Sequence, residues 1–236
     1  MIQAVFFDFN GVIVDDEPLQ MKAYQEVLGR EGLTVTEADY YGSLGMDDVA
    51  FVRAAFARAE READEATLVR VIEAKSEAHR KLLGDEPPLF PGVVTFVKAL
   101  ARRSPLGLVS MARRAEIDYV LERAALAGYF DVVVSAEDSP AHKPDPTCYN
   151  RALASLNAKR GEAHILPLRP DECLVIEDSP PGILSARAAG MRTLGVTNTV
   201  ADRALREAGA DSVTRSLADW TPDAVHHVFD TSWGKK

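Results

Sequence analysis

Several short apolar stretches of the chain lead into residues that can take part in phosphoryl chemistry. These residues are Asp8, Ser110, Lys143 and the adjacent pair Glu177 and Asp178. Together they supply a carboxylate nucleophile, a hydroxyl group, a cation and two hard oxygen ligands. Mg²⁺ prefers a few carboxylates together with phosphate oxygens and water. The set therefore predicts phosphoryl transfer assisted by Mg²⁺.

The apolar stretches themselves are typical of buried strands, because they are short, rich in β-branched residues and bounded by turn residues. We expect strands at residues 4–9, 106–109, 132–134, 173–176 and 193–196, and helices at 114–124, 147–156 and 182–189. This alternation predicts an α/β fold with a Rossmann-like parallel sheet covered by helices on both faces. Ligands of such sheets bind at the carboxyl ends of the strands, where the polar residues fall.

One region interrupts the alternation of strands and helices. Residues 15–85 are rich in Ala, Glu and Arg, have apolar positions at helical spacing and contain no convincing strand. They are followed by a segment with three prolines, Pro87, Pro88 and Pro91, which is typical of a linker. We therefore expect an inserted α-helical cap domain at 15–85, and an α/β core domain formed by residues 1–14 and 86–236.

Charge and cysteine content limit the class of function. The chain has 236 residues, of which 36 are acidic and 27 basic, which gives a formal net charge of -9. This excess argues against binding to nucleic acid or to an anionic membrane and favours a small soluble substrate. The two cysteines, Cys148 and Cys173, have no CxxC spacing, and no basic leader precedes the first apolar run. We expect a cytoplasmic protein, as a monomer or a weak homodimer.

Four motifs occur in a fixed order along the chain. They are Asp8-Phe9-Asn10-Gly11-Val12, then Ser110, then Lys143-Pro144-Asp145-Pro146, then Ile176-Glu177-Asp178-Ser179-Pro180-Pro181-Gly182. In this order the chain resembles the haloacid dehalogenase (HAD) superfamily from Ile2 to about Leu217. The most similar branch has a helical cap inserted after the first motif, as in β-phosphoglucomutases and in phosphatases of sugar phosphates and phosphoglycolate.

The resemblance implies a role for each motif residue. Asp8 would take the phosphoryl group as an aspartyl-phosphate, while Ser110 and Lys143 would bind the transferring phosphate. Mg²⁺ would be held by Asp8, the backbone carbonyl of Asn10 and Asp178, with Glu177 as a further ligand or as a residue that orients one. Simpler roles remain open: a turn or helix cap for Asp8, helix caps for Ser110 and Asp178, and a surface position for Lys143.

Asn10 departs from the pattern of the family. Phosphatases and mutases of this family carry a second aspartate there, which protonates the leaving group and then activates water. An amide cannot exchange a proton in this way, and loss of a positioned acid/base typically costs on the order of 10²–10⁴ in rate. Asn10 leaves the metal site intact and places turnover in question. A natural divergence, an engineered substitution and deamidation before Gly11 are all compatible with the sequence.

The cap also departs from the mutase pattern. The arginine that grips a second phosphate and the histidine near the entrance are replaced by Gly45 and Gln20. We therefore expect a phosphatase of a small monophosphate rather than a phosphomutase. The residues expected to contact the substrate are Asp16, Gln20, Ser110, Met111, Arg113 and Lys143, with Glu17, Tyr41, Met46 and Lys75 as further candidates.

The leading hypothesis is a magnesium-dependent phosphatase that acts on a small phosphorylated metabolite. The alternatives are a catalytically silent protein that binds phosphate and metal, and a phosphomutase. A hydrolase of carbon–halogen bonds is disfavoured, since dehalogenases of the family need no magnesium and Glu177 and Asp178 indicate a metal site.

Overall fold

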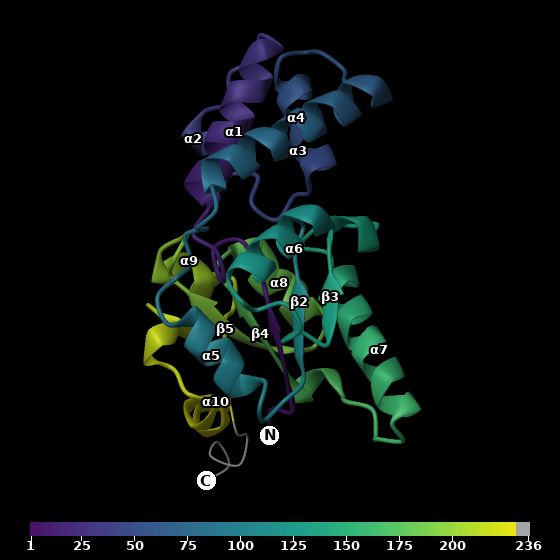
Figure 1. The fold of residues 1–236 in the computed structure, drawn as a ribbon, viewed down its shortest axis with the longest axis vertical. Helices are drawn as coiled ribbons and strands as arrows, with labels where there is room; N and C mark the ends of the chain where they lie inside the picture. The colour runs from purple at the N-terminus through teal and green to yellow at the C-terminus, as the bar shows by residue number, and fades with distance from the viewer. Residues whose placement is uncertain (230–236) are drawn as a thin grey trace.

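The computed structural model describes residues 1–229, and its centre is a parallel sheet of six strands (Figure 1). The strands are β1 (Ala4–Phe7), β2 (Leu106–Val109), β3 (Val132–Val134), β4 (Cys173–Glu177), β5 (Arg192–Val196) and β6 (Ser212–Thr214). Their order across the sheet is β3-β2-β1-β4-β5-β6, and every pair is parallel. The two strands that end at acidic residues, β1 and β4, are therefore direct neighbours.

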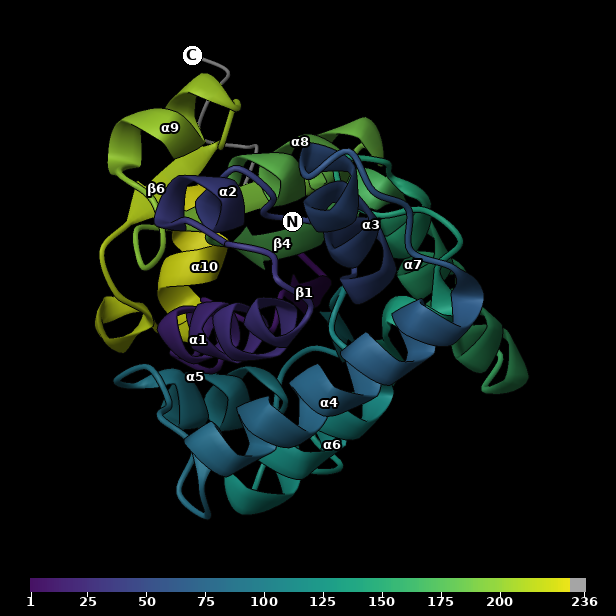
Figure 2. The ribbon, with the colours of Figure 1, turned by 90° about the horizontal axis from the view of Figure 1, so that it is seen from above.

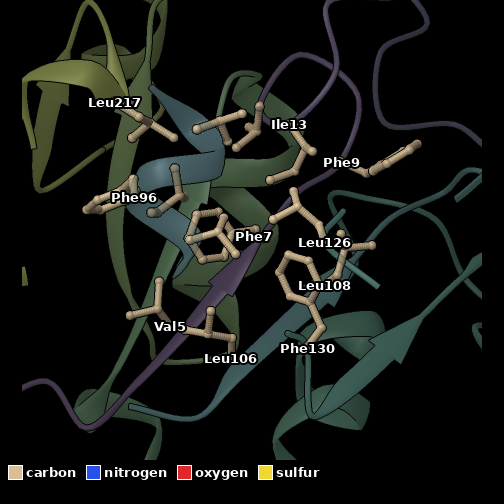
Figure 3. Packing of buried hydrophobic residues seen from close by; sticks show 14 of the residues in the cluster. Val5, Phe7, Phe9, Ile13, Phe96, Leu106, Leu108, Leu126, Phe130 and Leu217 are labelled. Atoms are coloured by element: carbon tan, nitrogen blue, oxygen red, sulfur yellow. The ribbon is translucent and has the colours of Figure 1, made fainter. Parts of the chain in front are cut away.

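Helices cover both faces of the sheet. Successive side chains of the central strand β1 point to opposite faces, and because all of them are apolar, both faces have to be covered. Phe7 of β1 packs edge-on against Phe96 and Phe130, with ring centroids 6.2 and 6.0 Å apart (Figure 3). Phe6 belongs to a second cluster on the other face. The first face is covered by α5 (Val93–Leu100), α6 (Arg114–Arg123) and α10 (Pro222–Phe229), and the second by α7 (Thr147–Glu162) and α8 (Pro180–Ala188).

The remaining elements of the core are short. A helix, α9 (Asp202–Glu207), packs beside β5 and β6, and 3₁₀ turns occupy η1 (Ala136–Asp138), η2 (Pro170–Glu172) and η3 (Leu217–Asp219). None of the helices among the described residues has the length and apolar character needed to cross a bilayer.

The insertion between β1 and α5 contains helices and no strand. It comprises α1 (Glu17–Arg30), α2 (Glu37–Tyr41), α3 (Asp48–Arg58) and α4 (Glu65–Leu83), which pack around a hydrophobic cluster of their own. These helices lie beyond the carboxyl ends of β1 and β4 (Figures 1 and 2). The two connections to the core run side by side, since Val14 forms a β-bridge with Leu89. The domain limits at residues 15 and 86 stay a prediction.

The predicted fold class, a Rossmann-like parallel sheet with helices on both faces, is confirmed. The strand prediction differs by one residue at the end of β4 and at the start of β5, and two larger differences have a structural reason. The first strand ends at Phe7 rather than Phe9, because the backbone turns there and Val12, Ile13 and Val14 all donate to the Phe9 carbonyl. The edge strand β6 was not expected, since three residues with one apolar side chain give no periodic signal.

Candidate active site

A buried lysine connects two carboxylates at the ends of β1 and β4. The Nζ atom of Lys143 donates to Asp8 Oδ1 at 2.7 Å and to Glu177 Oε1 at 2.6 Å, and it also contacts the Val109 carbonyl at 3.3 Å. Only 3% of Lys143 is exposed, which rules out the surface role for this residue. Burial and the adjacent Glu177 raise the pKa of Asp8 to about 7 against the opposing effect of Lys143.

Asp178 brings a third carboxylate to this point, and one of its oxygens is unpaired. One ligand oxygen from each of Asp8, Glu177 and Asp178 lies within 4.8 Å of the others. Asp178 Oδ2 is buried without a hydrogen-bond partner. Burial, followed by Asp8 and Glu177, raises the pKa of Asp178 well above its ordinary value. Three carboxylates with one lysine are short of positive charge, so they fit a divalent cation.

Gly11 makes room for Asp178. Its φ of +74° is a left-handed backbone conformation, and a Cβ atom at this position would lie 1.9 Å from Asp178 Oδ2. A side chain at residue 11 would therefore occupy the space beside the unpaired oxygen. The close approach of Asp178 to the turn after β1 therefore requires glycine at position 11.

Glu177 is held by several donors at once. Its Oε1 atom accepts from Lys143 and from the Tyr149 hydroxyl at 2.7 Å, and its Oε2 atom accepts from the Ser179 hydroxyl at 3.2 Å. A Cβ atom on Gly182 would lie about 2 Å from the carboxylate, so the glycine lets α8 begin directly above it. With both oxygens engaged, Glu177 is placed to orient Lys143.

The serines near the site have distinct roles. Ser179, not Asp178, caps α8, since its hydroxyl accepts from Gly182 N at 3.3 Å. The cap of α6 is Arg113, so Ser110 does not cap that helix. Ser110 Oγ accepts from Ala112 N at 3.0 Å. Its O–H group therefore remains able to donate to a bound oxyanion.

A cavity lies between this cluster and the inserted helices. Its lining from the core comprises Asp8, Asn10, Ser110, Met111, Ala112, Glu116, Lys143, Asp178 and Ser179. Its lining from the insertion comprises Glu17, Gln20, Tyr24, Tyr40, Ser43, Leu44, Gly45, Met46, Asp48, Phe51 and Lys75. The motifs at four strand ends thus open into one shared cavity.

The sequence model of haloacid dehalogenase-like hydrolases matches residues 2–190 of the chain. The chain belongs to this family. Fructose-1-phosphate phosphatase YqaB of Escherichia coli (strain K12) is 32% identical over 192 residues, which cover 81% of this chain and 95% of the relative. The phosphorylated carbohydrates phosphatase of Thermotoga maritima is 31% identical over 217 residues, 91% of this chain and 94% of the relative.

Solved structures share the fold of this HAD-like hydrolase. The β-phosphoglucomutase of Clostridium difficile aligns over 100% of both chains with a TM-score of 0.84 and 20% identity. A hydrolase from Pseudomonas syringae has a TM-score of 0.81 and 20% identity, covering 97% of this chain and 99% of the other. The predicted resemblance to the HAD superfamily and the predicted hydrolase class are confirmed.

Asn10 of the HAD-like motif is part of a buried polar group at the root of the insertion. Its Nδ2 atom donates to both carboxylate oxygens of Asp16 at 2.9 Å. Gln20 Nε2 lies 3.3 Å from Asp16 Oδ2, and His79 Nε2 lies 2.9 Å from the same oxygen. Asp16 is fully buried and His79 is 1% exposed. The amide at position 10 therefore matches a carboxylate at position 16.

A second group of buried charges links the insertion to the core. Lys75 Nζ lies 3.1 Å from Asp48 Oδ1 and 3.3 Å from Glu116 Oε1, and Ser76 Oγ donates to Glu116 at 2.9 Å. The Tyr24 hydroxyl donates to the same Asp48 oxygen. Burial is the largest single influence and raises the pKa of Glu116, but Lys75, His79 and Ser76 together outweigh it and hold this pKa below its ordinary value.

The structure brings most of the predicted site residues of this hydrolase together. Of the predicted substrate contacts, Gln20, Ser110, Met111 and Lys143 line the cavity, and so do the candidates Glu17, Met46 and Lys75. Asp16 lies behind Asn10 and does not line the cavity. Arg113 lies beside Ser76 at 3.3 Å and Glu137 at 3.9 Å, and Tyr41 is also absent from the lining. This placement does not support substrate contact by these three residues.

Several residues in and around the site were not expected from the sequence, and four of them make polar contacts there. Tyr149, His79, Asp48 and Glu116 all lie on helices that also carry many solvent-exposed polar side chains. These residues differ from the other polar residues of the same helices only in being buried. The residue type alone does not show which tyrosine or glutamate of a helix is the buried one. Their hydrogen-bond partners come from distant parts of the chain, so no local sequence motif predicts these residues.

Proposed function

We propose that the protein is a magnesium-dependent phosphatase that hydrolyses a small phosphorylated sugar or a related metabolite through an aspartyl-phosphate. The observation that carries the proposal is the arrangement at the floor of the cavity. There Asp8 lies against Lys143, beside the unpaired oxygen of Asp178 and the free O–H group of Ser110.

Asp8 would act as the nucleophile. Its carboxylate forms a bond to phosphorus while the bond from phosphorus to the substrate oxygen breaks, and water then cleaves the aspartyl-phosphate and restores the carboxylate. Lys143 and Ser110 would bind the equatorial oxygens of the phosphoryl group, and Glu177 and Tyr149 would keep Lys143 in place. Mg²⁺ held by Asp8, Asp178 and the Asn10 carbonyl would neutralise charge on the phosphoryl group.

The backbone at Gly45 supports a phosphatase over a phosphomutase. A Cβ atom at residue 45 would lie 2.8 Å from Pro181 Cβ and 3.2 Å from Lys143 Cβ, and φ of Gly45 is +87°. A long side chain that grips a second phosphate therefore has no space at this position. Relatives named for fructose 1-phosphate and hexitol phosphate hydrolysis agree with a sugar monophosphate as substrate.

Asn10 favours a second candidate, a protein that binds phosphate and Mg²⁺ without turnover. Its amide nitrogen donates to Asp16, and an amide cannot supply a proton to the leaving group. The cytoplasmic location, the monomeric or weakly dimeric state, and the absence of nucleic-acid and membrane partners stay predictions.

Phosphate release separates the two candidates. The wild-type chain is incubated with a panel of sugar and polyol monophosphates, with Mg²⁺ or with a chelator, and Asp8→Asn serves as the control. Release from at least one monophosphate that requires Mg²⁺ and falls by roughly 10³-fold or more in Asp8→Asn supports the phosphatase. Binding without release in the wild type supports the silent protein.

A further inference from the structure

The inserted helices contribute unpaired hydrogen-bond acceptors to the cavity. Gln20 and Asp48 both line it, and they are only 5% and 9% exposed. Gln20 Nε2 is used by Asp16, which leaves Gln20 Oε1 buried without a partner. Asp48 Oδ1 is used by Lys75 and Tyr24, which leaves Asp48 Oδ2 buried without a partner. Buried acceptors of this kind call for donors from a ligand.

The charged residues on the cap side of the cavity also favour a ligand that donates hydrogen bonds over one that carries an anionic group. Two carboxylates, Asp48 and Glu116, line it together with one cation, Lys75. The ammonium group of Lys75 is already shared between Asp48 and Glu116. Among the described residues that line the cap side of the cavity, none therefore offers a free positive charge to a second anionic group of a substrate.

We propose that Gln20 Oε1 and Asp48 Oδ2 form a subsite for hydroxyl or ammonium donors on the body of the substrate. This inference rests on the proposed function, because the phosphate of the same molecule occupies the Asp8 and Lys143 end. The favoured substrate is then a monophosphate of a polyol or of an amino polyol. A body that carries a carboxylate or a second phosphate is rejected, since its charge meets buried acids.

Three ligands that differ in one terminal group test this subsite. 1-Amino-1-deoxyglucitol 6-phosphate, glucitol 6-phosphate and 6-phosphogluconate share five carbons and the phosphate, and they end in an ammonium, a hydroxyl and a carboxylate group. We expect the ammonium and hydroxyl forms to bind the full-length Asp8→Asn chain with Mg²⁺ about 10-fold or more tightly than the carboxylate form. Calorimetric titration gives the three affinities, and kcat/KM of the wild type gives the same order if the chain turns over.

Two variants identify the residues responsible. Asp48→Asn removes the charge and should reduce the preference for ammonium over carboxylate by about 10-fold. Glu73→Gln removes one charge from the exposed side of α4, outside this cavity, and should leave the preference unchanged. If Asp48→Asn does not fold, Gln20→Met supplies the test: it should weaken glucitol 6-phosphate by about 3-fold or more and leave the affinity for inorganic phosphate unchanged.

The outcomes separate this inference from the proposed function. Equal or tighter binding of 6-phosphogluconate, failure of all three ligands to bind, or an unchanged preference in Asp48→Asn would each overturn the subsite. A wild-type chain that releases no phosphate contradicts the phosphatase alone, because the order of affinities is measured without turnover.

Discussion

Two buried groups of charges share one cavity, and they differ in how completely they are balanced. In the core group, Lys143 pairs with Asp8 and Glu177, and the third carboxylate, Asp178, has no lysine of its own among the described residues. In the cap group, Lys75 pairs with both Asp48 and Glu116. The pKa of Asp8 and that of Asp178 are raised, whereas the pKa of Glu116 is lowered. The core group is thus short of a cation, and the cap group is held together by its own lysine.

Asn10 lines the same cavity as the two groups, and its replacement gives the largest expected effect. An aspartate at position 10 would restore an acid/base but would face the buried carboxylate of Asp16 in place of two hydrogen bonds at 2.9 Å. We expect Asn10→Asp alone to lower the free energy of unfolding by about 2–4 kcal/mol. The double variant Asn10→Asp/Asp16→Asn exchanges the amide and the carboxylate between the two positions. It should raise steady-state phosphate release by roughly 10²–10⁴.

Asp16→Asn alone is the control for this exchange, since it keeps the amide at position 10. Phosphate release and urea unfolding are measured for the wild type, both single variants and the double variant. If Asn10→Asp alone is as stable as the double variant, the two positions are not coupled. Mass spectrometry of fresh protein shows whether deamidation at Asn10 contributes to the activity of the wild type.

The missing cation of the core group is the basis of the second prediction. Mg²⁺ at about 100 times its Kd should stabilise the folded protein by about 2.7 kcal/mol, which is several degrees in Tm for a chain of this size. Thermal melts with Mg²⁺ and with chelator measure the difference. Asp178→Ala should remove it. Coincident melts in the wild type would contradict the metal site and the contrast between the two groups.

Tyr149 tests whether Glu177 serves Lys143 or the metal. The hydroxyl of Tyr149 donates to Glu177 Oε1 at 2.7 Å, so Tyr149→Phe loosens the carboxylate that holds Lys143. We expect kcat to fall by about 3- to 10-fold, because one hydrogen bond is worth about 1 kcal/mol. The affinity for Mg²⁺, followed by the shift in Tm, should stay unchanged. A parallel loss of Mg²⁺ affinity would instead identify Glu177 as a ligand.

The core group was predictable from the sequence because each of its members follows a buried strand. Asp8, Lys143 and the adjacent pair Glu177 and Asp178 come from three separate motifs, and the parallel sheet brings strand ends to one edge. The cap group was not predictable in the same way. Lys75 and Asp48 lie on helices of the insertion and meet Glu116 of the core only through packing between helices. Helical periodicity places a residue on a face, but it does not say which face of another helix it meets.

Asp16 shows the limit of reasoning from one motif at a time. The sequence indicated Asn10 as a lost acid and Asp16 as a separate candidate for substrate contact. The structure joins the two, because the amide of one residue satisfies the carboxylate of the other. A pair of this kind is visible only once the chain between residues 10 and 16 has turned back on itself, as it does through the bridge of Asn10 with Val14.

The smallest expected effect concerns Glu17, an acid on the cap side of the cavity that forms no hydrogen bond with Lys75. Burial, followed by Asp16, raises the pKa of Glu17 from 4.5 to about 8, although the Tyr40 hydroxyl donates to it at 2.5 Å. The folded protein therefore keeps a proton between about pH 4.5 and 8 that the unfolded chain has lost. Because the folded state binds more protons in this window, the free energy of unfolding falls as the pH rises.

Glu17→Gln removes this contribution while keeping the shape of the side chain. We expect wild type to lose about 1 kcal/mol more than Glu17→Gln between pH 5 and 8, a value reduced for the partial exposure of the side chain. Urea unfolding at several pH values in chelator measures both proteins, and the titration of Asp8 and Asp178 cancels in the difference. Equal slopes would mean that Glu17 is ionised in the folded protein. The cap side would then carry a further negative charge. Among the described residues on this side, Lys75 would be the one cation for three ionised acids instead of two, and the contrast with the core group would be smaller.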